Sequence, residues 1–342
     1  MSIKPKISSI LPERAIPGAQ IEISGSNLMT AGDSIPKVFA NGIECRVTAM
    51  SSKRILANLP KIDDSSAVIQ IETHSGETNV FVITLGKEIA NEMHIVANPA
   101  IDPSDDAVIL TRSGSRGQQL ANTIFRLETD GYLDELPVQV LNPTGIAFGP
   151  SGGMFVTNRA EGTVLRIERG EEAVVVATDL GVATGIAFDR VGMMYVGDRS
   201  GTIYRVSETG DAETFATLEP SVAAYHLAFG PDGRLYVSSP GFASHDAIYT
   251  IDSNGSVERY VRGLGRPQGL AFDREGNLYV AACHKGRHGI VRIDDITQTI
   301  EQFVAGNNLV GLCFSRNGEM VVATNDSAYS LNLGIYGTLL GN

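Results

Sequence analysis

The sequence predicts an all-β protein in which a small β-sandwich precedes a six-bladed β-propeller. Three observations lead to this prediction. A phrase of about 40 residues recurs along most of the 342-residue chain, each copy divides into four short strands, and residues 4–85 follow a different pattern of strands and turns. The 37 glycines suit a chain that reverses direction so often.

The N-terminal region alternates short apolar strands with turn residues, which is typical of a β-sandwich. Seven strands are expected, at Lys6–Ile10, Gln20–Ser24, Lys37–Ala40, Arg46–Ala49, Arg54–Asn58, Ala67–Thr73 and Asn79–Leu85. A short linker follows at residues 86–91, so we expect the sandwich to lie close to the propeller and not to swing freely.

The same region resembles the IPT/TIG domains, which open with the pattern P.I..I.P..G..G..I.I.G.NL. The matching residues are Pro5, Ile7, Pro12, Pro17, Gly18, Ile21, Ile23, Gly25, Asn27 and Leu28, followed by Val38, Gly42, Pro60, Gly76 and Asn79. The resemblance implies an immunoglobulin-like sandwich over residues 1–86. It also implies a spacer or interaction module without catalytic residues.

Residues 87–342 contain the repeat, which is clearest in five copies that begin 40 to 43 residues apart. Each copy starts with a short apolar strand, passes through a Gly-containing turn and enters a strand rich in Tyr or Val. The copies begin at Gly145 (GIAFGPSGGMFVT), Gly185 (GIAFDRVGMMYVG), His226 (HLAFGPDGRLYVS), Gly269 (GLAFDREGNLYVA) and Gly311 (GLCFSRNGEMVVA). A degenerate sixth copy occupies residues 98–111, so six blades are expected to form a closed ring.

The third strand of each copy is also visible, as TVLRI, TIYRV, AIYTI and GIVRI. The chain has no Trp, which argues against propellers of the WD40 type. The combined phrase, PxGIAFDxxGNLYVA…GxIxRI, resembles the NHL-repeat propellers and the related senescence-marker/gluconolactonase family over roughly residues 90–331. The resemblance implies the fold, and the fold hosts both enzymes and binding platforms.

Closure of the ring requires one end of this region to complete the last blade. The tail at residues 332–340 and the segment at residues 88–96 are both suitable, and the sequence leaves the choice open.

Charge and composition limit the partners. The formal net charge of −12 argues against a nucleic-acid partner, and no segment has the length of a membrane span. The start of the chain has no apolar leader, so we expect a cytoplasmic protein or a mature secreted one. The three cysteines form no disulfide framework. Cys313 is expected to be buried, and Cys283 to be accessible.

The gluconolactonase resemblance implies a central divalent cation, usually calcium, bound by the residue before the first strand of several blades. Here these residues are Ala97, Thr144, Thr184, Tyr225, Gln268 and Val310, and none is acidic. Because calcium prefers carboxylate oxygens, this set argues against a calcium-dependent lactonase. Thr144, Thr184, Gln268 and the adjacent Asn98 remain candidate ligand-binding groups.

The loops that enter first strands and leave second strands should share one face, and this face is rich in arginine. Candidate ligand-binding residues are Arg112, Arg159, Arg199 and Arg266, with Arg116 and Arg287 nearby. Their guanidinium groups suit an anionic ligand. Alternatively, they pair with loop acids such as Glu161, Asp198 and Asp246. The third-strand arginines, Arg126, Arg166, Arg205 and Arg292, are expected to be structural.

Histidines give a sharper alternative on the same face. His226 replaces the leading Gly of one copy, and His284 and His288 lie in the long segment 283–289. Together they suit zinc or another divalent metal, or an acid–base pair, with Tyr225 as a proton donor. His245 lies in a second long loop.

Binding is therefore the leading functional prediction. The propeller face would capture an anionic small molecule, a glycan or a protein segment, with the sandwich as an interaction module. The alternative is a gluconolactonase-like hydrolase or propeller lyase that uses His226, Tyr225, His284 and His288. A third interpretation is a structural unit that self-associates.

Overall fold

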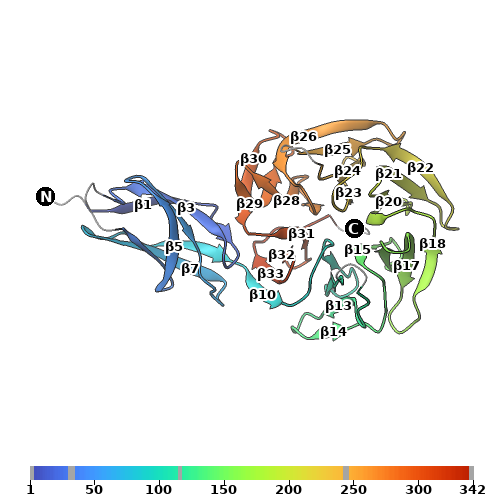
Figure 1. Cartoon of the computed structure of the whole chain (residues 1–342), viewed down its shortest axis with the longest axis horizontal. Helices are drawn as coiled ribbons and strands as arrows, with labels where there is room; N and C mark the ends of the chain where they lie inside the picture. The colour runs from blue at the N-terminus through green and yellow to red at the C-terminus, as the bar shows by residue number, and fades with distance from the viewer. Residues whose placement is uncertain (1–3, 30–34, 115–117, 242–245, 339–342) are drawn as a thin grey trace.

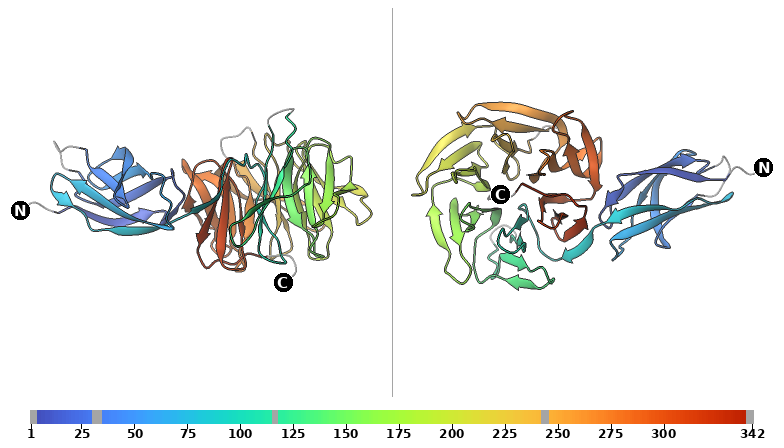
Figure 2. Two further views of the ribbon diagram at one scale, coloured as in Figure 1. Left: turned by 90° about the horizontal axis from the view of Figure 1, so that it is seen from below. Right: turned by 180° about the vertical axis from the view of Figure 1, so that it is seen from behind.

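The computed structural model describes residues 4–29, 35–114, 118–241 and 246–338, and every regular element within them is a β-strand. The sandwich lies beside a ring of repeats (Figures 1 and 2). Among the described residues no helix has the length and hydropathy to cross a membrane.

In the part of the sandwich that the structure describes there are nine strands, all seven expected ones and two short additions, β2 and β8. One sheet pairs β1, β3, β6 and β5, and the other pairs β4, β7 and β9. Alternate residues of β3 and β7 are buried between the sheets, as a two-layer fold requires. The bounds are β1 Lys6–Leu11, β2 Arg14–Ala15, β3 Gln20–Ser26, β4 Lys37–Ala40, β5 Ile43–Met50, β6 Arg54–Asn58, β7 Ser66–Thr73, β8 Gly76–Glu77 and β9 Phe81–Leu85.

The ring is built from antiparallel four-stranded repeats. The first three contain β11 Ala100–Ile101, β12 Val108–Thr111, β13 Ile124–Leu127 and β14 Leu133–Glu135; β15 Pro143–Phe148, β16 Met154–Asn158, β17 Thr163–Ile167 and β18 Val174–Ala177; and β19 Ala183–Phe188, β20 Met194–Asp198, β21 Thr202–Val206 and β22 Ala212–Thr217. The next two contain β23 His226–Phe229, β24 Leu235–Ser238, β25 Asp246–Ile251 and β26 Val257–Gly265; and β27 Leu270–Phe272, β28 Leu278–His284, β29 Arg287–Ile293 and β30 Ile300–Ala305. The last contains β31 Leu309–Phe314, β32 Glu319–Thr324, β33 Ala328–Asn332 and β10 Lys87–Ala90.

The prediction of six separate blades is wrong in one respect. Within the described residues only four of these repeats are separate four-stranded sheets. The strands β23–β26 and β27–β30 belong to one continuous sheet, because β26 extends to pair with the end of β28 through Leu264 with His284 and Gly265 with Cys283. The first strands nevertheless follow one another in a circuit, from β11 through β15, β19, β23, β27 and β31 back to β11.

An N-terminal strand closes the ring. β10 pairs with β33 as the outer strand of the last repeat, through Lys87 with Ser330 and Glu88 with Tyr329. Residues 333–338 of the tail take another course and cross to β27, where the Thr338 N–H donates to the Phe272 carbonyl at 3.1 Å. Of the two alternatives left open by the sequence, the segment at residues 88–96 supplies the strand, and β10 lies within the predicted linker.

Aromatic packing between repeats explains the Tyr of the second strand. Tyr279 of β28 stacks edge-on at 5.1 Å against Phe303 of its own repeat and at 5.1 Å against Phe314 of the next. Tyr195 and Tyr236 make equivalent contacts. Such pairs stabilise a core beyond their buried area, so each repeat depends on its neighbour.

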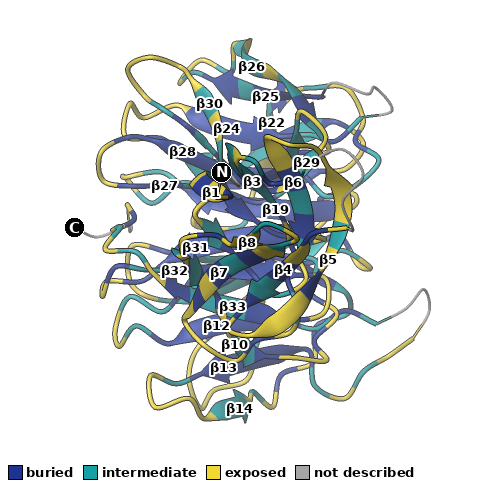
Figure 3. Ribbon diagram, turned by 90° about the vertical axis from the view of Figure 1, so that its left-hand side faces the viewer, coloured by how far each residue is buried: buried dark blue, intermediate teal, exposed yellow. Residues whose placement is uncertain are grey.

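The sandwich is docked against the ring. β2 pairs in parallel with β9 of the sandwich and with β30 of the ring, where Ala15 opposes Ala305. One hydrophobic cluster therefore runs from Leu85 in the sandwich to Leu309 in the ring. Figure 3 views the molecule from the sandwich side, with the ring behind it. The close placement expected from the short linker is what the structure has.

Candidate functional site

A depression of about 820 Å³ opens on the face where loops enter first strands and leave second strands. Six of the eight predicted ligand-binding residues line it: Thr144, Arg159, Thr184, Arg199, Arg266 and Gln268. They come from the second and third repeats and from the connection between the fourth and fifth, and are brought together only by the closure of the ring. Arg116 and His245, also expected on this face, lie outside the described residues.

Two of the arginines are neighbours in equivalent positions, directly after β16 and β20. Arg199 is held by two backbone carbonyls, with Nε 3.2 Å from the Ser221 oxygen and Nη2 3.0 Å from the Val222 oxygen. Arg159 makes no ion pair or side-chain hydrogen bond with any described residue. Burial and the positive charge of the neighbouring Arg199 lower the pKa of the Arg159 guanidinium.

The loop acids do not neutralise these arginines. Glu161 accepts a hydrogen bond from the Asn158 amide at 2.8 Å, and Asp198 accepts one from the Val182 N–H at 2.8 Å. Asp246 accepts from the backbone N–H groups of Gly241 at 3.0 Å and Arg266 at 3.2 Å. Each carboxylate thus accepts hydrogen bonds from groups other than the three arginine side chains. No ion pair joins an acid to Arg159, Arg199 or Arg266 among the residues that the structure describes.

The predicted polar residues Thr144, Thr184 and Gln268 form most of their hydrogen bonds with other residues of the ring. The buried Thr184 hydroxyl donates to the Gly197 carbonyl at 2.9 Å and accepts the Tyr225 N–H at 3.1 Å. The Thr144 hydroxyl donates to the Asn142 carbonyl at 3.0 Å. Gln268 is only half-buried, and its amide nitrogen makes a long contact of 3.5 Å to the Leu309 carbonyl. Among these three, Gln268 is the one best able to contact a ligand.

Asn98 and Arg112, two of the predicted ligand-binding residues, do not line the depression. Asn98 occupies the notch left by Gly269 and Gly311, where a β-carbon would lie 1.8 and 2.4 Å from its Oδ1. It links two repeats by accepting the Leu312 N–H and donating to the Leu270 carbonyl, both at 3.2 Å. The backbone N–H of Arg112 donates to Thr123 in the first repeat.

The predicted histidine site is not assembled. Segment 283–289 is a hairpin and not a loop, so its side chains alternate between two sides. Cys283 and His288 oppose each other and line the depression, whereas His284 pairs with Arg287. Both ring nitrogens of His284 are buried without a hydrogen-bond partner, and burial with the charge of Lys285 lowers its pKa.

His226 and Tyr225 are also misplaced for chemistry at this surface. His226 is 4% exposed inside β23, and burial lowers its pKa to about 4. Tyr225 is fully buried and donates its hydroxyl hydrogen to the Glu219 carbonyl, and burial raises its pKa. Within the described ranges no three His, Cys, Asp or Glu side chains are grouped as metal ligands. The catalytic and metal set of His226, His284 and His288 is therefore corrected, and only His288 lies in the depression.

Three further polar residues among those described line the depression without having been predicted, namely His94, Asn308 and Asn325. His94 and Asn308 lie in segments that enter first strands, and Asn325 follows the second strand β32. These are the same loop positions, before first strands and after second strands, from which the arginines were predicted, so the sequence could have indicated these three residues as well. Asn side chains, however, are also common turn formers, and this hides their role in the sequence.

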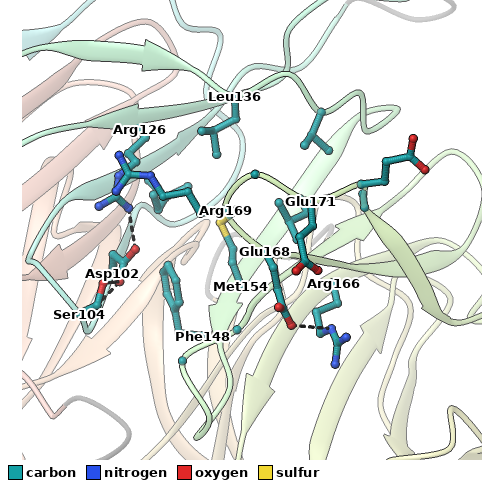
Figure 4. Close-up of a pocket in the computed structure, with 18 of the residues that line it drawn as sticks. Asp102, Ser104, Arg126, Leu136, Phe148, Met154, Arg166, Glu168, Arg169 and Glu171 are labelled. Carbon is teal, nitrogen blue, oxygen red and sulfur yellow. Dashed lines mark hydrogen bonds and ion pairs between the residues drawn. The ribbon is translucent and has the colours of Figure 1, made fainter.

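A second cleft, of about 880 Å³, lies on the opposite face between the first two repeats (Figure 4). Arg126 lines this cleft and is 4% exposed. It forms ion pairs with Asp102 at 2.6 Å, Glu128 at 2.9 Å and Asp105. Arg166 pairs with Glu168 at 3.2 Å. Its arginines are thus paired with carboxylates, which favours the arginine-lined depression as the ligand site.

Comparison with known proteins identifies the sandwich. Residues 5–84 match the family model of the IPT/TIG domain. This region is an IPT/TIG domain. The match covers less than half of the chain, and comparison with curated protein sequences finds no match.

Solved structures share the fold. An auxiliary nutrient binding protein from Bacteroides ovatus is 14% identical, with a TM-score of 0.55 over 95% of this chain and 97% of that one. A gluconolactonase-like protein is 17% identical, with a TM-score of 0.61 over 74% and 93% of the two chains. A streptogramin B lyase is 17% identical, with a TM-score of 0.53 over 87% and 98%. At these identities the likeness shows the architecture alone.

Proposed function

We propose that this protein binds an anionic small molecule or an acidic glycan in the depression of its propeller, with the IPT/TIG domain as an interaction module. One observation carries the proposal: Arg159, Arg199 and Arg266 line a single cavity, and their guanidinium groups form no ion pair with any described residue, although Asp246 also lines the cavity and accepts the Arg266 backbone N–H. Guanidinium groups recognise carboxylates and phosphates through paired hydrogen bonds, so an anion would supply the missing partner.

The dimensions and the surrounding charge support this proposal. A volume of about 820 Å³ suits a small-molecule ligand, for which sites span about 300–1,000 Å³. The whole chain carries a formal charge of −12, so an arginine-lined cavity is a local exception that would need to attract its ligand at short range. Nutrient-binding proteins among the structural neighbours favour a binding role by analogy.

An enzyme of the lactonase or lyase type is the second candidate. The exposed His288 favours it, because this imidazole and Cys283 share the depression with the arginines. His288 would act as an acid or base on a ligand held by Arg159 and Arg199. Loss of turnover in His288→Gln with anion binding retained would support this candidate over simple binding.

A titration of the full chain with a panel of small ligands tests the binding proposal. The panel contains citrate, inorganic phosphate and glucuronate, with glucose as the neutral comparison. We expect binding of at least one anion, weaker at high salt, and a loss of about 10-fold or more in Arg199→Ala because charged hydrogen bonds contribute about 1.5–3 kcal/mol.

The matched control is Arg205→Ala. Arg205 lies on β21, the third strand of the same repeat as Arg199, where it pairs with Glu213 of β22 and does not line the depression. Equal affinities for wild type, Arg199→Ala and Arg205→Ala would contradict the proposal. Binding of glucose alone would also contradict it.

A further inference from the structure

The segments of the ring that the IPT/TIG domain holds are also segments that line the depression. Two segments are involved, the hairpin 283–289 and the connection 305–310 between β30 and β31. Cys283, His288, Gly306, Asn308 and Leu309 line the cavity from this side. We call these two segments the sandwich-side wall.

The connection 305–310 is tied to the sandwich by backbone contacts. The Ile16 N–H donates to the Ala305 carbonyl at 2.9 Å, and the Asn307 amide donates to the Gly18 carbonyl at 3.1 Å. Ile16 also packs against Gly306 so closely that an added β-carbon there would lie 3.1 Å from its side chain. The sandwich therefore contributes to the course of this connection, and a β-carbon at Gly306 would require the side chains of Leu309 and Ile16 to shift.

The hairpin 283–289 is tied to the sandwich by charge. Arg287 forms an ion pair with Glu22 of β3, and only 13% of the Glu22 side chain is exposed. Because strand residues alternate, Arg287 faces the sandwich while its neighbour His288 faces the cavity. Within the ring, the His288 carbonyl accepts the Gly306 N–H at 3.1 Å and the Gln302 amide at 2.8 Å, which joins the two wall segments.

We propose that the IPT/TIG domain positions the sandwich-side wall and thereby sets the affinity of the depression for its ligand. This inference rests on the proposed binding function. Glu22 and Ile16 are positioning residues, since they contact the wall and not the cavity. By linkage, a partner that binds the sandwich and shifts it would change ligand affinity, and ligand binding would change the affinity for that partner.

The test uses the full chain and compares Glu22→Gln with Arg54→Gln. Arg54 is the second partner of Glu22, at 3.6 Å, but it lies on β6 of the sandwich and forms no hydrogen bond or ion pair with the described residues of the wall. Amide hydrogen exchange is measured for peptides covering 283–289 and 303–310, and for 155–162 and 195–201 across the cavity. The affinity for citrate is measured in parallel.

We expect Glu22→Gln to accelerate exchange in the sandwich-side wall only, and to weaken citrate binding by about 3- to 10-fold. Arg54→Gln should change neither quantity. The double variant Glu22→Gln/Arg287→Gln should bind citrate as weakly as Glu22→Gln alone, because both changes break one contact. Additive losses would show a direct effect of Arg287 on the ligand and overturn the inference.

Unchanged exchange in the wall, or faster exchange with unchanged affinity, would also overturn it. These outcomes differ from failure of the proposed function. If neither citrate nor any other anion of the panel binds to the wild-type protein, the binding proposal fails. The exchange comparison then still decides whether the sandwich orders this wall.

Discussion

Arg159 lies beside Arg199 at the rim of the depression, and burial together with the neighbouring positive charge lowers the pKa of the Arg159 guanidinium. Two cations kept together without a carboxylate raise the free energy of the folded state. Binding sites commonly retain such arrangements, because residues arranged for function are rarely optimal for stability.

Replacement of Arg159 by Ala should therefore cost little stability while it removes affinity. We expect the free energy of unfolding in urea to change by less than about 0.5 kcal/mol, as for a surface substitution away from paired groups. Destabilisation by more than about 2 kcal/mol would mean that Arg159 is a structural residue, and the binding proposal would lose its main support.

Replacement of Arg126, in contrast, should lower the stability of the protein strongly. Burial opposes its charge, but hydrogen bonds to Glu128, Asp102 and Asp105 raise its pKa. Arg126→Met leaves these carboxylates without a cation, so we expect a loss of about 3–5 kcal/mol of unfolding free energy at pH 7. Arg166→Met, at an exposed and equivalent position of the next repeat, is the control and should cost under about 1 kcal/mol.

The deficit of Arg126→Met should also depend on pH. Burial would raise the pKa of Asp102, but hydrogen bonds from Ser104 and Arg126 outweigh it and lower that pKa in the folded protein. In the wild type this contribution is present above the unfolded pKa of 3.8 and is lost as the pH falls through the lower folded value. In the variant the unpaired carboxylates gain from protonation, so the deficit should shrink on acidification. A deficit that stays constant as the pH falls from 7 to well below 3.8 would contradict this account.

His226 should make stability fall in mild acid. Its pKa is about 4 in the folded protein and 6.5 in the unfolded chain, so the unfolded chain takes up a proton first. Stability is lost from about pH 6.5 downward and the loss is complete near pH 4, with a total of roughly 3 kcal/mol at about 1.4 kcal/mol per pKa unit. His226→Gln should remove this part of the pH profile, whereas His288→Gln should leave it in place. Identical profiles for wild type and His226→Gln would refute the assignment.

Substitution of Asn98 tests whether this residue has a structural role or a ligand-binding role. Asn98→Ala leaves the Leu312 N–H and the Leu270 carbonyl without their partner, so we expect a loss of about 1–3 kcal/mol in unfolding free energy. Citrate affinity should stay within twofold of wild type, because Asn98 does not line the cavity. A loss of affinity without a loss of stability would restore the original prediction of a ligand-binding role.

Most of the fold could be predicted because its determinants are local. The GIAFDxxG phrase places a turn carboxylate beside two backbone N–H groups: Asp273 Oδ1 accepts from Glu275 at 3.0 Å and Asn277 at 2.9 Å, and its Oδ2 receives the Tyr279 hydroxyl at 3.1 Å. One copy therefore predicts the others. The joining of β26 to β28 depends on how far two strands extend, and no local pattern records this.

Loop position predicted correctly that Arg159, Arg199 and Arg266 lie on one face, but it did not predict where His226 and His284 lie. Treating 283–289 as a loop grouped His284 with His288, but as a hairpin it places them on opposite sides. His226, which replaces a Gly of the repeat, was expected to point towards the axis or to hold its rim, and it is buried at the start of the inner strand β23. The role of Asn98 depends on two glycines of other repeats, about 170 and 210 residues later in the chain, so it emerges only from the closed ring.

The most direct test of the central claim is the dissociation constant of the best anion of the panel, measured by calorimetric titration of wild type and Arg159→Ala at about 50 mM salt. We predict at least a 10-fold increase in Arg159→Ala with an unchanged unfolding free energy. Equal dissociation constants for the two proteins would contradict the claim that this arginine-lined depression is the binding site.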